Sequence, residues 1–178
     1  MPRTKTIRIL GIDPGTNETG IAITENQEIL FWGVKTWKRC CSRSCKEVLN
    51  RARKEIGKLI EQYEPQVLVL ESDPVLKKRG SETLNVLVKE IKSLARKQRI
   101  RISQFKPKAI KSCICDNERS SKMKVARELA SRYPELNRYL RPGKGWNRSR
   151  EKYWQKMFCA LSLCLTHWDQ EKSKHDQN

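Results

Sequence analysis

The chain has 178 residues, which is enough for one domain with a hydrophobic core and too few for two comfortable ones. It carries 38 Lys and Arg against 20 Asp and Glu, a formal net charge of +18. A folded domain this basic indicates a polyanionic partner, because self-repulsion otherwise only destabilises the compact state. Nucleic acid is the first candidate for that partner, and an anionic membrane surface is the second.

The sequence shows neither an export signal nor a membrane span. Residues 1–5 lead straight into a strand pattern, without the long apolar core of a signal peptide. The longest apolar run, around residues 158–165, is far too short to cross a bilayer. We therefore expect an intracellular, cytoplasmic protein with no membrane partner, in which the seven cysteines are reduced thiols.

The first part of the chain predicts three strands, then one helix, then a fourth strand. Apolar runs at residues 7–12, 20–24 and 29–34 are separated by short polar turns, which is typical of an antiparallel meander. Residues 45–63 carry apolar side chains at helical spacing, and Pro65 stops that helix. The continuous apolar run at residues 67–71 predicts a strand buried on both faces, as in a parallel sheet.

The second part alternates helix and strand patterns. It predicts helices at 81–98, 107–115, 120–132 (with Ser120 as N-cap) and 148–168, a strand at 100–105, a basic loop at 133–147 and a disordered tail at 169–178. The order predicts a single α/β domain over residues 1–168. Its core would be a central mixed five-stranded sheet with helices on both faces.

Two predicted strands end in a carboxylate. Asp13 follows the first strand and is itself followed by a Pro-Gly turn, and Glu71 ends the strand at 67–71. If these strands are neighbours, the two acids converge, and like charges that close require a cation. Oxygen ligands alone favour Mg²⁺ or Mn²⁺ over zinc.

These residues and a third stretch resemble the RuvC family of Holliday-junction resolvases, which have an RNase H-like fold. The resemblance rests on Gly11-Ile12-Asp13-Pro14-Gly15 with Thr19-Gly20, on Glu71, and on residues 105–111, which are similar to the Pro-x-x-Val-Lys segment of the family. Lys111 stands in the place of the first functional lysine of the family, and Lys122 follows at the spacing of the second. The similarity covers about residues 7–168.

The resemblance implies a homodimer that binds four-way DNA junctions and makes paired nicks by Mg²⁺-dependent phosphodiester hydrolysis, with Mn²⁺ able to substitute. Asp13 would bridge two metal ions and Glu71 would hold one of them. Lys111 and Lys122 would neutralise the charge that builds on the phosphate.

The final helix departs from the family pattern. The family places two aspartates one turn apart before a small-apolar run, and those positions fall here on Lys156 and Cys159. Three interpretations stay open: Glu151 supplies the missing carboxylate, Lys156 occupies a metal position electrostatically and the enzyme is slow or dead, or this helix register is wrong. A thiol is a poor ligand for Mg²⁺ in any of them.

Two further segments are candidates for DNA contact. The loop after Glu71 would present an aliphatic wedge, Val75 and Leu76, beside the basic residues Lys77, Lys78 and Arg79. The basic stretch at 138–150, including Lys144, would contact backbone phosphates. A zinc site built from Cys40, Cys41 and Cys45 together with Cys113 and Cys115 is a weaker interpretation, because the one residue between Cys113 and Cys115 is too few for a normal zinc knuckle.

The sequence thus leaves two main functions open, besides a third, an RNase H-like enzyme that acts on another nucleic-acid structure such as an RNA–DNA hybrid, against which the retained lysine pair argues. The first is a metal-dependent crossover junction endodeoxyribonuclease that acts in recombination and repair. The second is a catalytically weakened or inactive protein of the same kind, which binds branched DNA or structured RNA without cutting. The third carboxylate is the feature that separates them.

Overall fold

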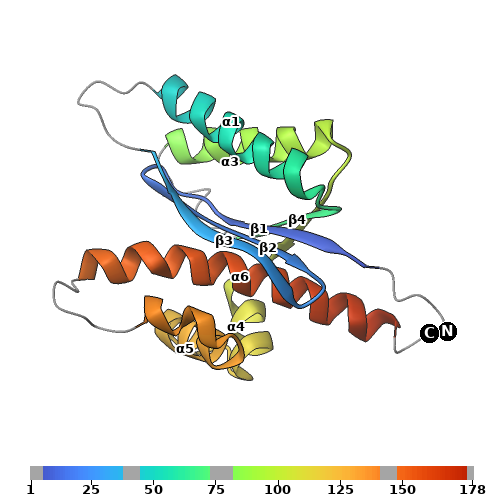
Figure 1. The fold of residues 1–178 in the computed structure, drawn as a ribbon, viewed down its shortest axis with the longest axis vertical. Helices are drawn as coiled ribbons and strands as arrows, with labels where there is room; N and C mark the ends of the chain where they lie inside the picture. Colours follow the sequence, from blue (N-terminus) through green and yellow to red (C-terminus); the bar gives the residue numbers. More distant parts are fainter. Residues whose placement is uncertain (1–5, 38–44, 73–81, 141–147, 176–178) are drawn as a thin grey trace.

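In the computed structural model, which describes residues 6–37, 45–72, 82–140 and 148–175, five strands form one sheet (Figure 1). The strands are β1 (Arg8–Asp13), β2 (Glu18–Glu25), β3 (Glu28–Thr36), β4 (Val67–Glu71) and β5 (Arg101–Phe105). Their order across the sheet is β3-β2-β1-β4-β5. The first three pair antiparallel, whereas β1, β4 and β5 run parallel. The predicted meander and the mixed five-stranded sheet are therefore confirmed.

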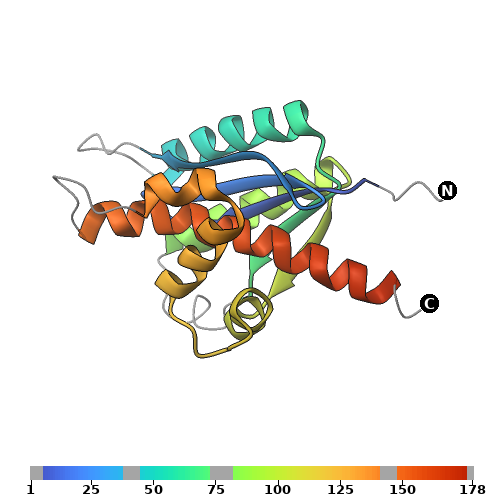
Figure 2. The ribbon, with the colours of Figure 1, turned by 60° about the horizontal axis from the view of Figure 1, so that its bottom comes forward.

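The helices cover both faces of this sheet, as predicted. On one face lie α1 (Cys45–Tyr63) and α3 (Glu82–Lys97). On the other lie α4 (Pro107–Cys115), α5 (Lys122–Arg132), the 3₁₀ turn η1 (Pro134–Tyr139) and the long α6 (Arg148–His175) (Figure 2). None of these helices combines the length and the apolar character needed to cross a bilayer.

Alternation along the central strands divides the core into two. Ile9 of β1 and Val69 of β4 pack with α4, α5 and α6, whereas Leu10 and Ile12 of β1 pack with α1 and α3. Successive residues of a strand point to opposite faces, so one apolar strand supplies both clusters. Asp13 therefore shares the α6 face of the sheet with Ile9.

Helix α6 lies unusually close to β1 and β2 because two glycines leave room for its backbone. A Cβ on Gly11 would collide with the carbonyl oxygen of Ala160, and a Cβ on Gly20 would collide with that of Lys156. Both glycines lie inside strands, where glycine otherwise weakens the sheet. Close approach of the α6 backbone is the physical reason for them here.

Helix α6 is longer than the sequence pattern indicated. It continues through His175, so residues 169–175 are helical where we expected the disordered tail to begin. Contacts from distant segments stabilise this extension: Arg101 forms an ion pair with Glu171 (3.3 Å), and the Cys113 thiol donates to Asp169. The N-cap of α5 is also Ser121, not Ser120, since the Ser121 side chain accepts from the Lys124 N–H.

We expect Gly20→Ala to destabilise the fold by about 2–3 kcal/mol, because the new methyl group meets backbone atoms of α6 that cannot move independently. Gly57→Ala is the matched control. Gly57 lies inside α1 with no atom within 4 Å of the position that a Cβ would take, and we expect a gain of about 0.5–1 kcal/mol from helix propensity. Urea unfolding of both variants gives the comparison. Equal effects of the two substitutions would contradict the close approach of α6 as the reason for Gly20.

Candidate functional site

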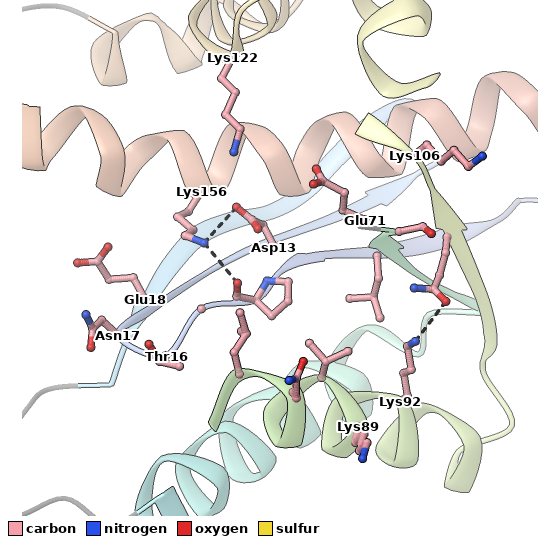
Figure 3. Close-up of a pocket in the computed structure, with 18 residues that line it drawn as sticks. Asp13, Thr16, Asn17, Glu18, Glu71, Lys89, Lys92, Lys106, Lys122 and Lys156 are labelled. Atoms are coloured by element: carbon pink, nitrogen blue, oxygen red, sulfur yellow. Dashed lines mark hydrogen bonds and ion pairs between the residues drawn. The ribbon is translucent and has the colours of Figure 1, made fainter. Parts of the chain in front are cut away.

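Asp13 and Glu71 lie at the ends of neighbouring parallel strands. The register pairs Ile12 of β1 with Leu70 of β4, so the following residues, the two acids, stand next to each other at the sheet edge. Both side chains line one open cavity of about 1040 Å³ (Figure 3). The structure therefore brings together the two carboxylates that the sequence singled out.

The turn after Asp13 is held by two buried side chains. The Thr19 hydroxyl bonds to both the N–H and the carbonyl of Gly15 (3.3 and 3.2 Å). The indole N–H of Trp37 donates to the Gly15 carbonyl and to the Thr19 hydroxyl (3.2 and 3.1 Å). Thr19 and Trp37 are 0% and 3% exposed. This network fixes the backbone that positions the Asp13 carboxylate.

Lys156 points from α6 into the same cavity. Its Nζ lies 3.5 Å from Oδ2 of Asp13 and donates to the carbonyl oxygen of Pro14 at 3.3 Å (Figure 3). Burial raises the pKa of Asp13, and the charges of Lys156 and Lys122 oppose that shift. The lysines thus stabilise an ionised carboxylate in a place where desolvation disfavours it.

Cys159 lies one turn further along α6. Burial raises the pKa of its thiol to about 12, with a further increase from the charges of Asp13 and Glu71. Cys159 therefore lies within electrostatic reach of the two acids, although it is not among the residues that line the cavity. At neutral pH it is a protonated, soft sulfur group, which is a poor partner for Mg²⁺.

The other predicted site residues divide between the cavity and elsewhere. Lys122, the first residue of α5, lines the cavity, and Lys111 of α4 is not among its lining residues. Glu151 lies in a separate small cavity against Tyr139 and Trp154. The structure therefore does not bring Glu151 to Asp13 and Glu71.

The cavity also contains residues that the sequence reasoning missed. They are Glu18 at the start of β2, Lys89 and Lys92 on α3, and Lys106 after β5. Glu18 lies on the far side of Lys156 from Glu71 (Figure 3). Lys89 and Lys92 are three residues apart on a helix, which places them on one face, but 38 basic residues make that spacing uninformative on its own.

Several predicted DNA contacts lie outside the described residues: Val75, Leu76, Lys77, Lys78, Arg79 and Lys144. The cysteines that the structure describes are all free: Cys45, Cys113, Cys115, Cys159 and Cys164.

The family resemblance implies a pair of Mg²⁺ ions, and the residues at this site do not fit such a pair. Within the described ranges, no three side chains of His, Cys, Asp or Glu come together in a way that could hold a metal ion. Asp13 and Glu71 supply carboxylate oxygens, but the α6 positions beside them carry an ammonium group and a protonated thiol. The site is rich in cationic groups and poor in metal ligands.

Comparisons with known proteins agree with the fold. The family model for crossover junction endodeoxyribonuclease RuvC matches residues 9–142, a range that ends before α6. No curated protein matches the chain.

Among solved structures, Thermus thermophilus RuvC is similar at a TM-score of 0.68 and 16% identity, covering 90% of this chain and 92% of that chain. The same protein in complex with a Holliday junction substrate gives 0.67 and 16%, with the same coverage. The yeast mitochondrial Holliday junction resolvase gives 0.63 and 16%, covering 95% of this chain and 81% of that chain. These matches confirm the predicted RNase H-like fold.

The raised pKa of Cys159 predicts low reactivity toward iodoacetamide. A pKa of about 12 in place of 9.0 leaves about a thousandfold less thiolate at pH 8. Both thiols are partly exposed, and we expect the peptide that contains Cys159 to stay unmodified in the folded protein while Cys45 reacts, as measured by mass spectrometry. Denatured protein, in which every thiol should react, is the control. Comparable labelling of Cys159 and Cys45 in the folded state would contradict the raised pKa of the Cys159 thiol.

Proposed function

The chain belongs to the RuvC family of crossover junction endodeoxyribonucleases, and from that membership we propose that it recognises four-way DNA junctions as a homodimer. One structurally similar protein, Thermus thermophilus RuvC, has been solved in complex with a Holliday junction substrate. A four-way junction with paired arms suits a dimer with two-fold symmetry, because each protomer then presents the same surface to one half of the DNA.

The observation that carries this proposal is the concentration of cationic side chains around the cavity at the strand ends. Five of its lining residues are lysines: Lys89, Lys92, Lys106, Lys122 and Lys156. They come from four parts of the fold, namely α3, the residue after β5, α5 and α6, and they line the same cavity as the two acids. Lysine ammonium groups bind phosphates as point charges, independently of base sequence.

Binding without cleavage is the form of this function that the geometry supports best. The charges of Lys156 and Lys122 act on Asp13, and the described residues bring no group of three His, Cys, Asp or Glu side chains together that could hold a metal ion. The charge balance therefore suits a site that holds DNA backbone rather than one that assembles two divalent ions around a scissile phosphate.

Junction resolution by Mg²⁺-dependent nicking is the second candidate, and one observation favours it. Asp13 and Glu71 still meet at the edge of the sheet, and Lys122 lines the same cavity. In this candidate the two acids are the ligands of Mg²⁺ or Mn²⁺, and Lys111 and Lys122 act on the phosphate.

We expect the protein to bind a synthetic four-way junction at least about tenfold more tightly than a linear duplex of the same sequence, in EDTA as well as in Mg²⁺. Phosphate contacts predict that the logarithm of the affinity falls linearly with the logarithm of the salt concentration. Fluorescence anisotropy measures both, and mass photometry should find two protomers on each junction. Equal affinity for junction and duplex would contradict the proposal.

A labelled junction incubated in Mg²⁺ and in Mn²⁺ separates the two candidates. We expect no nicking by the wild type in either metal and junction affinity at least equal to wild type for Asp13→Asn, which removes a negative charge from the cavity. Nicking that is abolished by Asp13→Asn would establish the second candidate. Glu151→Gln should then cut like the wild type, because Glu151 lies outside the cavity.

A further inference from the structure

The side chain of Lys156 is held in place by the residues around it. The ammonium group has two oxygen acceptors fixed by the fold, Oδ2 of Asp13 and the carbonyl of Pro14. A Cβ on Gly15 would collide with the backbone carbonyl of Glu18, so the turn itself requires glycine there, and it would also come within 3.1 Å of Lys156 Nζ, which shows how closely the lysine packs against this turn. Gly20 in turn allows the Lys156 backbone to pack against β2. Four positions of one hairpin, Asp13, Pro14, Gly15 and Gly20, therefore lie against this lysine.

Lys156 nevertheless remains accessible from the cavity. Its side chain is 30% exposed, and that of Asp13 is 23% exposed. Salt bridges that keep this much exposure are weak on their own, so structural stability is a poor explanation for the pair. An ammonium group that is held in place and remains accessible from the cavity is suited to bind a ligand there.

The ammonium group supplies positive charge at one side of the acid pair, next to Asp13. Two carboxylates at adjacent strand ends repel each other unless positive charge lies between or beside them. Here Lys156 supplies it from within the chain, and Lys122 adds a second charge that acts on Asp13. The neighbouring α6 position, Cys159, contributes no oxygen that could recruit a metal ion instead.

We propose that Lys156 is a built-in substitute for a divalent ion: its ammonium group occupies the cation position beside Asp13 and binds the DNA phosphate that enters the cavity directly. The DNA half of this statement rests on the junction binding proposed above. Two consequences follow. Divalent ions do not bind at Asp13 in the wild type, and junction binding does not depend on them.

Manganese binding measured by electron paramagnetic resonance tests the first consequence without DNA. The wild type should show no saturable site at Asp13 below roughly 1 mM Mn²⁺. Lys156→Asp places a third carboxylate beside Asp13 and Glu71 and should gain a site that binds at least about tenfold more tightly. Adding Asp13→Asn to this variant should remove the gained site.

Two further variants keep this test decisive. Lys156→Gln is neutral and of similar size, so it should gain weaker Mn²⁺ binding even if three carboxylates impair folding, which circular dichroism would show. Lys172→Gln removes the same charge from an exposed position of α6, about 24 Å along the helix, and should behave like the wild type. Wild-type binding of Mn²⁺ as tight as that of Lys156→Asp, and lost in Asp13→Asn, would overturn the proposal.

Junction binding in EDTA tests the second consequence. Loss of one charge-assisted phosphate contact should weaken binding by Lys156→Asp at least about tenfold, and Mn²⁺ should restore it. Wild type and Lys172→Gln should bind equally with and without the metal. Unchanged affinity of Lys156→Asp in EDTA would refute the phosphate contact. A wild type that binds no junction would refute the proposed function but not the role of Lys156 as the cation beside Asp13. The manganese experiment measures metal binding at Asp13 in the absence of DNA.

Discussion

The site depends on the close contact of α6 with the first two strands of the sheet. Gly11 and Gly20 carry no side chain, and the backbone of α6 occupies the space that a Cβ would fill at either position. A helix kept at an ordinary distance by larger residues would leave Lys156 and Cys159 too far from Asp13 to interact with it. The two glycines therefore determine which residues of α6 share the cavity with the acids, while the identity of those residues determines its chemistry.

That chemistry is a balance of charge in a partly desolvated place. Burial raises the pKa of Asp13, and Lys156 and Lys122 act in the opposite direction. In a site built from carboxylates alone, the same balance would require divalent ions from solution. Here the chain carries the compensating charge itself, with Lys156 fixed by Asp13 and by the carbonyl of Pro14. Metal-free retention of DNA phosphates is the behaviour that such an arrangement favours, and it is compatible with the fold of the RuvC family.

Local patterns in the sequence predicted most of the fold, because apolar spacing and Pro-Gly signals act over short distances. The helix Cys45–Tyr63 and the strands that end in Asp13 and Glu71 followed from such patterns, whereas the sequence left open that these two strands are neighbours, which the structure shows. The extension of α6 to His175 did not, since the polar stretch after Trp168 is stabilised by partners far away in the chain, such as Arg101. The position of Glu151 was equally hidden, because two turns of helical spacing do not tell which neighbour a helix face meets. Lys122 and Lys156 were identified through the family pattern, but Lys89, Lys92 and Lys106 could not be distinguished among 38 basic residues until the fold brought them together.

Lys156, and not a divalent ion, is in our proposal the cation beside Asp13. Anomalous diffraction from wild-type crystals soaked in millimolar Mn²⁺ tests this most directly, because it locates the metal and the side chain in the same experiment. We predict no manganese peak between Asp13 and Glu71, with Lys156 Nζ remaining within ion-pair distance of the Asp13 carboxylate. A manganese peak coordinated by Asp13 and Glu71, with Lys156 displaced from both Asp13 and Pro14, would contradict the proposal.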